Sequence, residues 1–377
     1  MSADINADLL SFRHQIDAID QDILLLLNKR ASLAQAIGHV KAQTDAPVMR
    51  PEREAQVLDA LNAANQGPLN TRHVNVLFKE IMSVCRALER EVSVAFLGPF
   101  GTYTEQAVWQ FFGHCVHAEP VDTIEQVFRH LETKQVDFAL VPVENSTEGA
   151  VARTLDALVD STVSICGEVQ LPIHHQLLCQ TGRLDGILKI CAHPQALAQC
   201  RSWLAKHAPL IRVEAVSSNG EAAKLASEDA SVAAIAGQAA RDRYGLHAYQ
   251  EQIQDDAHNT TRFWVLGNQQ AGPSGIDKTS LVASVNNQPG AVHKLLEPLS
   301  VHRVSMTRLE SRPARTGKWE YYFFIDLQGH QTDPAVAKAL GELRETASFL
   351  RIFGSYPASQ RSQTSECGTT TPCSEKK

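Results

Sequence analysis

The sequence predicts a multidomain protein with an all-helical module, then an α/β module, then a small α+β module of ferredoxin-like order. Residues 6–91 repeat apolar side chains near a period of 3.6 and contain almost no glycine, which is typical of helices. Residues 92–267 alternate short apolar runs with amphipathic stretches, as α/β domains do. Residues 277–357 show a strand, a helix, two strands, a helix and a strand in that order. A length of 377 residues agrees with two or three domains.

The composition argues against several classes of protein. Hydrophobic residues make up 44% of the chain and charged residues 20%, as in ordinary globular proteins. The formal net charge of −7 leaves no basic excess for binding nucleic acid. No run approaches the roughly 18 apolar residues that span a membrane, and the first residues lack a basic signal-peptide start. The eight cysteines form no CxxC pair, so we expect reduced thiols in a cytoplasmic protein.

The helical module is expected to contain three helices. The first runs from about 7 to 43, which at 1.5 Å per residue is roughly 55 Å. A helix of that length buries its apolar stripe better against a partner chain than against one small domain, so we expect a homodimer. Pro51 suits the first turn of a second helix that ends near Gly67. Asn70 or Thr71 can cap a third, which ends near Arg90.

Basic residues on the first helix form a candidate anion site. Arg30 and Lys41 are eleven residues apart and share a face. Arg13 lies roughly 25 Å from Arg30 along the axis, so both can grip one small molecule only if they come from two antiparallel chains. Taken singly, each is more often a solvated charge. Residues 1–91 hold 10 basic and 12 acidic residues, which favours a pocket over a basic patch.

Three motifs in this module resemble the all-helical chorismate mutase family: Ser11-Phe12-Arg13-His14-Gln15-Ile16-Asp17, Gly38-His39-Val40-Lys41 and Arg50-Pro51-Glu52-Arg53-Glu54. The resemblance implies an intertwined dimer that rearranges chorismate, a dicarboxylate, to prephenate. It also implies that Arg13 of the partner chain and Arg30 bind carboxylates and that Lys41 donates to the ether oxygen. Arg53 and Glu54 would position the ring end, with Cys85 also at the substrate, while the role of Arg50 stays open.

One residue departs from this family pattern. Glu89 stands where some members have glutamine near the ether oxygen. A carboxylate there would repel the negative charge that develops on that oxygen. We therefore expect Glu89 to act in its protonated form, with mutase activity falling as the pH rises and Glu89→Gln flattening that fall.

In the central module, polar clusters follow predicted strands. They begin after Leu97, Val143 and Cys191, at the strand ends where open α/β sheets bind ligands. Residues 98–101 alone are explained equally well by a tight turn, and they match no nucleotide-binding fingerprint. The neighbours His174 and His175 would point to opposite faces of a strand, and no second spaced pair completes a metal site.

Three of these clusters together resemble prephenate dehydratase: Gly98-Pro99-Phe100-Gly101-Thr102, Glu144-Asn145-Ser146-Thr147-Glu148-Gly149 and Asn259-Thr260-Thr261-Arg262-Phe263. The resemblance implies two α/β lobes around a cleft, as in periplasmic binding proteins, and no cofactor. Thr261 would donate to the departing hydroxyl, and Arg262 would be a positive anchor or a cleft-closing contact. Neutral donors would come from Thr102, Asn145, Ser146 and Gln199. Ala192 replaces a serine common in relatives, so one substrate hydrogen bond is lost or comes from elsewhere.

The C-terminal module resembles the phenylalanine-binding ACT domain. The resemblance rests on Asn287-Gln288-Pro289-Gly290-Ala291-Val292 and Glu310-Ser311-Arg312-Pro313. Taken only as structure, the Pro-Gly and Arg-Pro pairs in these motifs are typical of turns. The resemblance implies feedback inhibition by L-Phe, bound by Asn287, Gly290, Ala291, Val292, Glu310, Ser311, Arg312 and Pro313. ACT modules pair side by side, so dimer versus tetramer stays open.

The expected boundaries are 1–91 for the mutase domain, 92–270 for the dehydratase domain and 277–357 for the ACT domain, followed by a disordered tail at 358–377. Together the resemblances imply a bifunctional enzyme of L-phenylalanine biosynthesis. Two alternatives remain: an amino-acid sensor without catalysis, and a dehydratase whose helical module serves only dimerisation.

Overall fold

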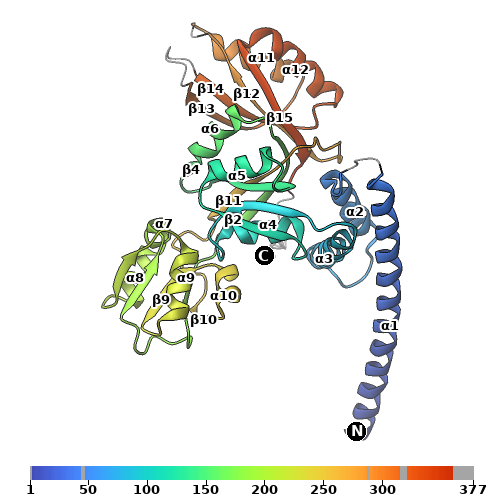
Figure 1. The fold of residues 1–377 in the computed structure, drawn as a ribbon, viewed down its shortest axis with the longest axis vertical. Helices are drawn as coiled ribbons and strands as arrows, with labels where there is room; N and C mark the ends of the chain where they lie inside the picture. Colours follow the sequence, from blue (N-terminus) through green and yellow to red (C-terminus); the bar gives the residue numbers. More distant parts are fainter. Residues whose placement is uncertain (1, 44–46, 287, 315–320, 360–377) are drawn as a thin grey trace, which may run out of the picture.

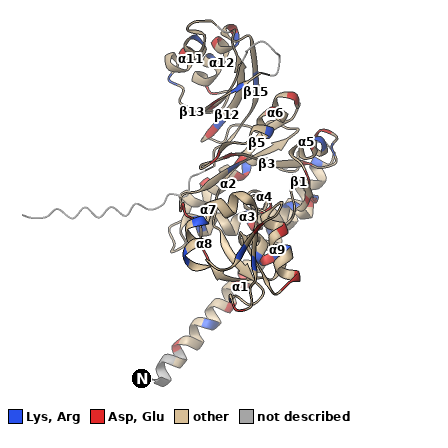
Figure 2. Cartoon of the chain, turned by 90° about the vertical axis from the view of Figure 1, so that its left-hand side faces the viewer, with Lys and Arg blue, Asp and Glu red and all other residues tan. Residues whose placement is uncertain are grey.

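A computed structural model describes residues 2–43, 47–286, 288–314 and 321–359. The predicted ligand residue Asn287 and the tail cysteines Cys367 and Cys373 lie outside the described residues. Figure 1 shows helices, two neighbouring α/β lobes and a third sheet arranged along the long axis. Lys and Arg are interspersed with Asp and Glu over the face in Figure 2. Within the described residues, every helix is too short or too polar to cross a membrane.

The helical module comprises α1 (Ser2–Lys41), α2 (Pro51–Ala64) and α3 (Thr71–Glu89), as predicted. Pro51 occupies the first turn of α2, and the Asn70 side chain caps α3 by accepting a hydrogen bond from His73 N at 2.9 Å. Much of α1 projects from the body (Figures 1 and 2). Its apolar residues are therefore left at the surface, with Phe12 and Leu24 exposed by 59% and 61%.

The central module consists of two lobes, which confirms the predicted fold class. The sheet of the first lobe has the order β2-β1-β3-β11-β5, with β4 on β3. Its strands are β1 (Ser93–Leu97), β2 (His117–Val121), β3 (Phe138–Asn145), β4 (Gly149–Ala150), β5 (Ser164–Pro172) and β11 (Thr260–Gly267), and its helices are α4 (Tyr103–Phe112), α5 (Ile124–Glu132) and α6 (Ala152–Asp160). The chain leaves this lobe after β5 and returns in β11.

The second lobe has the sheet order β10-β6-β9-β7-β8. Its strands are β6 (Gln176–Cys179), β7 (Lys189–Ala192), β8 (Arg212–Ala215), β9 (Val232–Ala236) and β10 (His247–Gln250). Its helices are α7 (Pro194–Gln199), α8 (Arg201–His207), α9 (Asn219–Glu228) and α10 (Gln238–Tyr244). The mixed sheet is buried on both sides, because the all-apolar run of β9 has helices on each face.

The C-terminal module has the predicted βαββαβ order and a four-stranded antiparallel sheet, β13-β14-β12-β15. Its elements are β12 (Asp277–Ser284), α11 (Ala291–Val301), β13 (Met306–Pro313), β14 (Tyr321–Gln328), α12 (Pro334–Thr346) and β15 (Phe349–Pro357). The last strand pairs with β12 from Phe349 to Pro357.

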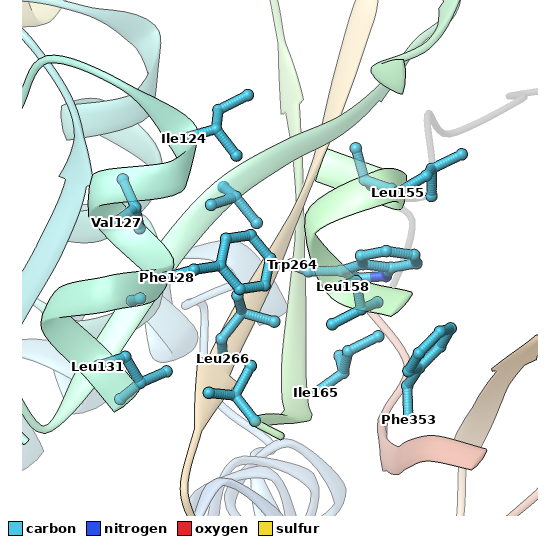
Figure 3. Close-up of a cluster of buried hydrophobic side chains, with 14 of the residues drawn as sticks. Ile124, Val127, Phe128, Leu131, Leu155, Leu158, Ile165, Trp264, Leu266 and Phe353 are labelled. Atoms are coloured by element: carbon cyan, nitrogen blue, oxygen red, sulfur yellow. The ribbon is translucent and has the colours of Figure 1, made fainter. Parts of the chain in front are cut away.

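This sheet and the first lobe share one hydrophobic core. Phe324 and Phe353 of the C-terminal module pack in the same cluster as Trp264 and Ile165 of the lobe, several of which Figure 3 shows. A Cβ on Gly354 would lie 2.2 Å from the carbonyl oxygen of Ile165, so the two backbones approach closely there. The two modules are therefore packed as a unit.

Candidate active sites and ligand pocket

The ends of β3 and β11 form the first candidate site, in the cleft between the lobes. Thr261 pairs with Asn145 in the ladder, and Asn145 Nδ2 lies 2.9 Å from Thr261 Oγ1. The register shifts beside this pair, because Val143 is an extra residue on β3. Strict alternation would place Asn145 on the face of Val141 and Val143. The bulge instead turns Asn145 toward Thr261, as bulges near active sites often do.

A backbone turn determines the direction of the hydrogen bonds in this cleft. The Oδ1 of Asn145 accepts from the backbone N of Thr147 and Glu148, at 3.0 and 3.2 Å, so its Nδ2 must be the donor. That Nδ2 donates to Thr261 and, at 2.9 Å, to Asn259 Oδ1. The Thr261 oxygen thus accepts from Asn145 and keeps its own O–H for another acceptor.

The hydrogen-bond network continues through three residues that were not predicted as site residues, namely Asn259, His175 and Tyr103. Asn259 Nδ2 donates to Gln199 Oε1, which also lies 2.9 Å from His175 Nε2. The His175 Nδ1 is then the acceptor, 2.8 Å from the Tyr103 hydroxyl. Burial lowers the pKa of His175 below its usual 6.5, which keeps the ring neutral, and burial raises the pKa of Tyr103 well above 10. Tyr103 and His175 are 72 positions apart in the sequence, so no local motif indicates that they share a hydrogen-bond network.

A pocket of about 80 Å³ opens at this network. Its lining is Tyr103, Asn145, Ile173, His175, His193, Gln195, Ala196, Gln199, Asn219, Asn259 and Thr261. None of these lining residues is an aspartate, glutamate, lysine or arginine. Tyr103 is the first residue of α4 and Asn219 is the first residue of α9, so the first turns of two helices contribute to the lining. The N–H groups and the positive dipole end of a helix N-terminus favour an anionic ligand.

The remaining predicted donors have structural partners and do not line the pocket. Thr102 caps α4, and Ser146 Oγ accepts from Thr260 N at 3.0 Å. Ala192 is fully buried. Their roles toward substrate stay predictions. Within the described residues, no group of three or more His, Cys, Asp or Glu could hold a metal ion.

Arg262 does not point into the cleft. Side chains alternate along β11, so Arg262 lies on the opposite face from Thr261, near the Trp264 ring. It is buried and bound to Glu168 at 2.8 Å and to Asp326 of β14 at 2.5 Å. Arg262 therefore lies outside the cleft in this structure, and its role as a positive anchor or a cleft-closing contact stays a prediction.

In the helical module, Lys41 lies at the contact between α1 and α3. Its Nζ is 3.2 Å from Glu89 Oε2 and 3.0 Å from the Val48 carbonyl oxygen. A Cβ on Gly38 would lie 3.0 Å from Glu89, so a glycine lets the two helices approach. Glu89 is thus paired with Lys41 in this structure, and its action in the protonated form stays a prediction for the site with substrate.

The other predicted mutase residues are spread out in a single chain. Arg13 and Arg53 are exposed, Arg30 is half-buried and Cys85 is buried. Burial raises the pKa of Glu54, an effect that its partner Arg86 opposes. Arg86 also donates to the carbonyl oxygen of Phe112 in the central module. A single chain therefore does not bring the predicted mutase residues together, because Arg13 and Arg30 are 17 positions apart on α1.

A second pocket, of about 250 Å³, opens in the C-terminal module. Its lining is Val285, Gln288, Gly290, Ala291, Val292, His293, Tyr321 and Phe323. Gly290 has a positive φ of 80° and precedes α11, so the predicted residues Gly290, Ala291 and Val292 meet there. The predicted residues 310–313 lie on β13 and do not line it. Arg312 instead binds Asp156 of α6.

Comparisons with known proteins match each module. Family models for chorismate mutase type II, prephenate dehydratase and the ACT domain match residues 12–90, 94–271 and 279–345. A bifunctional chorismate mutase/prephenate dehydratase of Neisseria gonorrhoeae is 49% identical over 95% of this chain and 99% of its own length. The protein of that name from Escherichia coli K12 is 31% identical over 93% and 96%. The structure of prephenate dehydratase from Arthrobacter aurescens with L-Phe has a TM-score of 0.66 and 34% identity, and covers 71% of this chain and 90% of that chain.

Proposed function

The chain belongs to the bifunctional chorismate mutase/prephenate dehydratase family, and from this premise we propose how its sites divide the work. The helical module rearranges chorismate to prephenate. The cleft of the central module converts prephenate to phenylpyruvate, and L-Phe inhibits that step through the ACT module. The six described cysteines are free thiols, which supports our proposal of a cytoplasmic enzyme.

The dehydratase proposal rests on one observation, that the hydroxyl proton of Thr261 is not used in its hydrogen bond with Asn145. Asn145 donates to Thr261 Oγ1, so the threonine O–H is available for the hydroxyl that leaves prephenate. The electrons of the bond to the lost CO2 enter the ring as the carbon–oxygen bond breaks. The hydroxyl leaves as hydroxide that accepts a hydrogen bond from Thr261, and a proton from solvent converts it to water. Aromatisation drives the step, so a positioned donor suffices. The substrate carboxylate left on the product would be held by the N-termini of α4 and α9.

The mutase proposal requires a second chain. The rearrangement needs no nucleophile, only the reactive conformer and a donor at the ether oxygen. Lys41 is that donor and Arg30 binds a carboxylate. We propose that Arg13 comes from the partner of a homodimer, because the exposed apolar residues of α1, such as Ile16 and Leu24, need a covering surface.

The 250 Å³ pocket is the proposed L-Phe site. Its lining combines the turn before α11 and the first residues of that helix with the aromatic Tyr321 and Phe323. The N–H groups of a helix start suit an amino-acid carboxylate, and the aromatic rings suit a phenyl side chain.

The proposed function is tested by supplying chorismate to the purified chain and following prephenate and phenylpyruvate separately, with and without L-Phe. We expect both products, with only phenylpyruvate formation suppressed by L-Phe. Prephenate that accumulates without phenylpyruvate would refute the Thr261 assignment. No turnover of chorismate or of added prephenate would instead support an amino-acid sensor.

We expect dehydratase activity to fall at acid pH because His175 becomes protonated. Its pKa is lowered below 6.5, so the ring is neutral above pH 6.5 and takes up a proton only as the pH falls below that value. A proton on Nδ1 reverses the bond with Tyr103, whose hydroxyl can donate instead to the His174 carbonyl oxygen at 3.0 Å, and it puts a cation into the network. The unfolded chain binds this proton at a higher pH, so stability also declines below pH 6.5.

The measurement is kcat/KM against pH for the wild type and for His175→Gln, with melting temperatures in the same buffers. His193 also lines the pocket, and His193→Gln is the matched control. An acid limb that is identical in His175→Gln and in the wild type would contradict the assignment.

A further inference from the structure

The ends of β3 and β11 carry two neighbouring pairs that face opposite ways. Asn145 and Thr261 face the cleft, while the next pair in the ladder, Glu144 and Arg262, faces the ACT module. We propose that Asp326 of the ACT module is a positioning residue for Thr261, acting through Arg262. We propose that this contact also couples L-Phe binding in the ACT module to the dehydratase site. The proposal rests on the proposed function and names the connection between its two sites.

Arg262 is held by groups from both modules. Its Nε binds Glu168 of β5 at 2.8 Å, its Nη1 binds Asp326 of β14 at 2.5 Å, and its Nη2 lies 3.1 Å from the Tyr356 hydroxyl of β15. Ser280 of β12 donates to the second oxygen of Asp326 at 2.6 Å. Arg262 is 8% exposed and Asp326 is 1% exposed, so this geometry is shielded from solvent. A planar guanidinium bound on three sides has little freedom to turn.

Two further ion pairs extend the network across the junction. Lys278 Nζ of β12 lies 2.7 Å from Glu168 Oε1, and Arg308 Nε of β13 lies 3.3 Å from Glu144 Oε2. All four strands of the ACT sheet thus contact charged residues on three strands of the first lobe. The Nη1 and Nη2 atoms of Arg308 are buried and have no hydrogen-bond partner in the described part of the chain. Unpaired buried donors are costly, so this part of the junction is incompletely satisfied in the structure.

The L-Phe pocket is joined to this network along one strand. Tyr321 and Phe323 line the pocket, and Asp326 follows three residues after Phe323 on β14. The odd spacing places Phe323 and Asp326 on opposite faces, one toward the pocket and one toward Arg262. A ligand that moves β14 therefore moves the partner of the residue adjacent to Thr261. A change of a few tenths of an ångström matters there, because Thr261 must meet the leaving hydroxyl at hydrogen-bond distance.

The test uses the full chain and the variant Asp326→Asn, which keeps the shape and removes the charge. We expect kcat for prephenate to fall several-fold with little change in KM, since Thr261 is displaced but the helix N-termini are not. We expect maximal inhibition by saturating L-Phe to weaken at least about fivefold. Calorimetric binding of L-Phe is expected to stay within a few-fold, which a simple loss of the pocket would not allow.

Arg351→Gln is the matched control. Arg351 of β15 also crosses the junction, donating to the carbonyl oxygens of Leu158 and Val159, but it does not contact the network. It should keep inhibition by L-Phe. Tyr356→Phe removes the bond to Arg262 and the contact with Ser280 while nearly keeping the side-chain volume. It should change kcat and inhibition in the same direction as Asp326→Asn, and it serves if that variant folds poorly.

The possible outcomes distinguish failure of the proposed function from failure of the proposed connection between the two sites. A wild type that does not dehydrate prephenate, or is insensitive to L-Phe, refutes the proposed function itself. A wild type inhibited by L-Phe beside Asp326→Asn and Tyr356→Phe variants with unchanged kcat and unchanged inhibition refutes only the connection. Weakened inhibition in Arg351→Gln to the same degree would mean that any loosening of the junction suffices, which also overturns the role of Asp326.

Discussion

Replacing Thr261 with valine should lower dehydratase kcat by about 10²–10⁴-fold, the range that a positioned proton donor contributes. Valine has nearly the shape of threonine but lacks the hydroxyl, so it removes the donor to the departing oxygen. It also leaves Asn145 Nδ2 without one of its two acceptors. The measurement is steady-state turnover of prephenate, followed by phenylpyruvate formation.

The same chain provides the control for this experiment. Mutase activity on chorismate should stay at the wild-type level, because Lys41 and Glu89 lie in a different module. Thr261→Ser restores a hydroxyl at this position and should recover most of the lost rate. A valine variant with nearly full dehydratase activity would show that Thr261 is not the donor.

Arg30→Ala should lower mutase activity by about 10²-fold or more while leaving dehydratase activity unchanged. The loss follows from leaving a substrate carboxylate without its guanidinium partner, since charged hydrogen bonds contribute about 1.5–3 kcal/mol each. Arg13→Ala should have the same effect, although Arg13 lies far from Arg30 on the same helix.

A mixed dimer distinguishes a shared site from a site within one chain. A dimer of one Arg13→Ala chain and one Arg30→Ala chain has one site with both losses and one intact site. Such dimers, co-expressed with two different tags and purified through both, should recover about half of the wild-type mutase activity. No recovery would place the whole site in one chain. Loss of dehydratase activity in Arg30→Ala would contradict separate active sites.

Much of this protein follows from local sequence signals. Pro51 and Asn70 act within one turn of the helices they begin, so α2 and α3 were predicted from the sequence alone. The strand and helix periods likewise determine the βαββαβ order of the ACT module. The functional clusters follow for the same reason, because the polar segments after β1, β3 and β7 mark strand ends.

Other features depend on contacts between residues far apart in the chain. The extra residue at Val143 turns Asn145 toward Thr261, 116 positions later. The ladder register also places Arg262 on the face of the ACT module, which the motif containing Thr261 and Arg262 does not reveal. His175 and Tyr103 join the cleft only because the lobes pack together. Sequence spacing determines local turns and periods, whereas register, bulges and packing between modules are decided when distant strands meet.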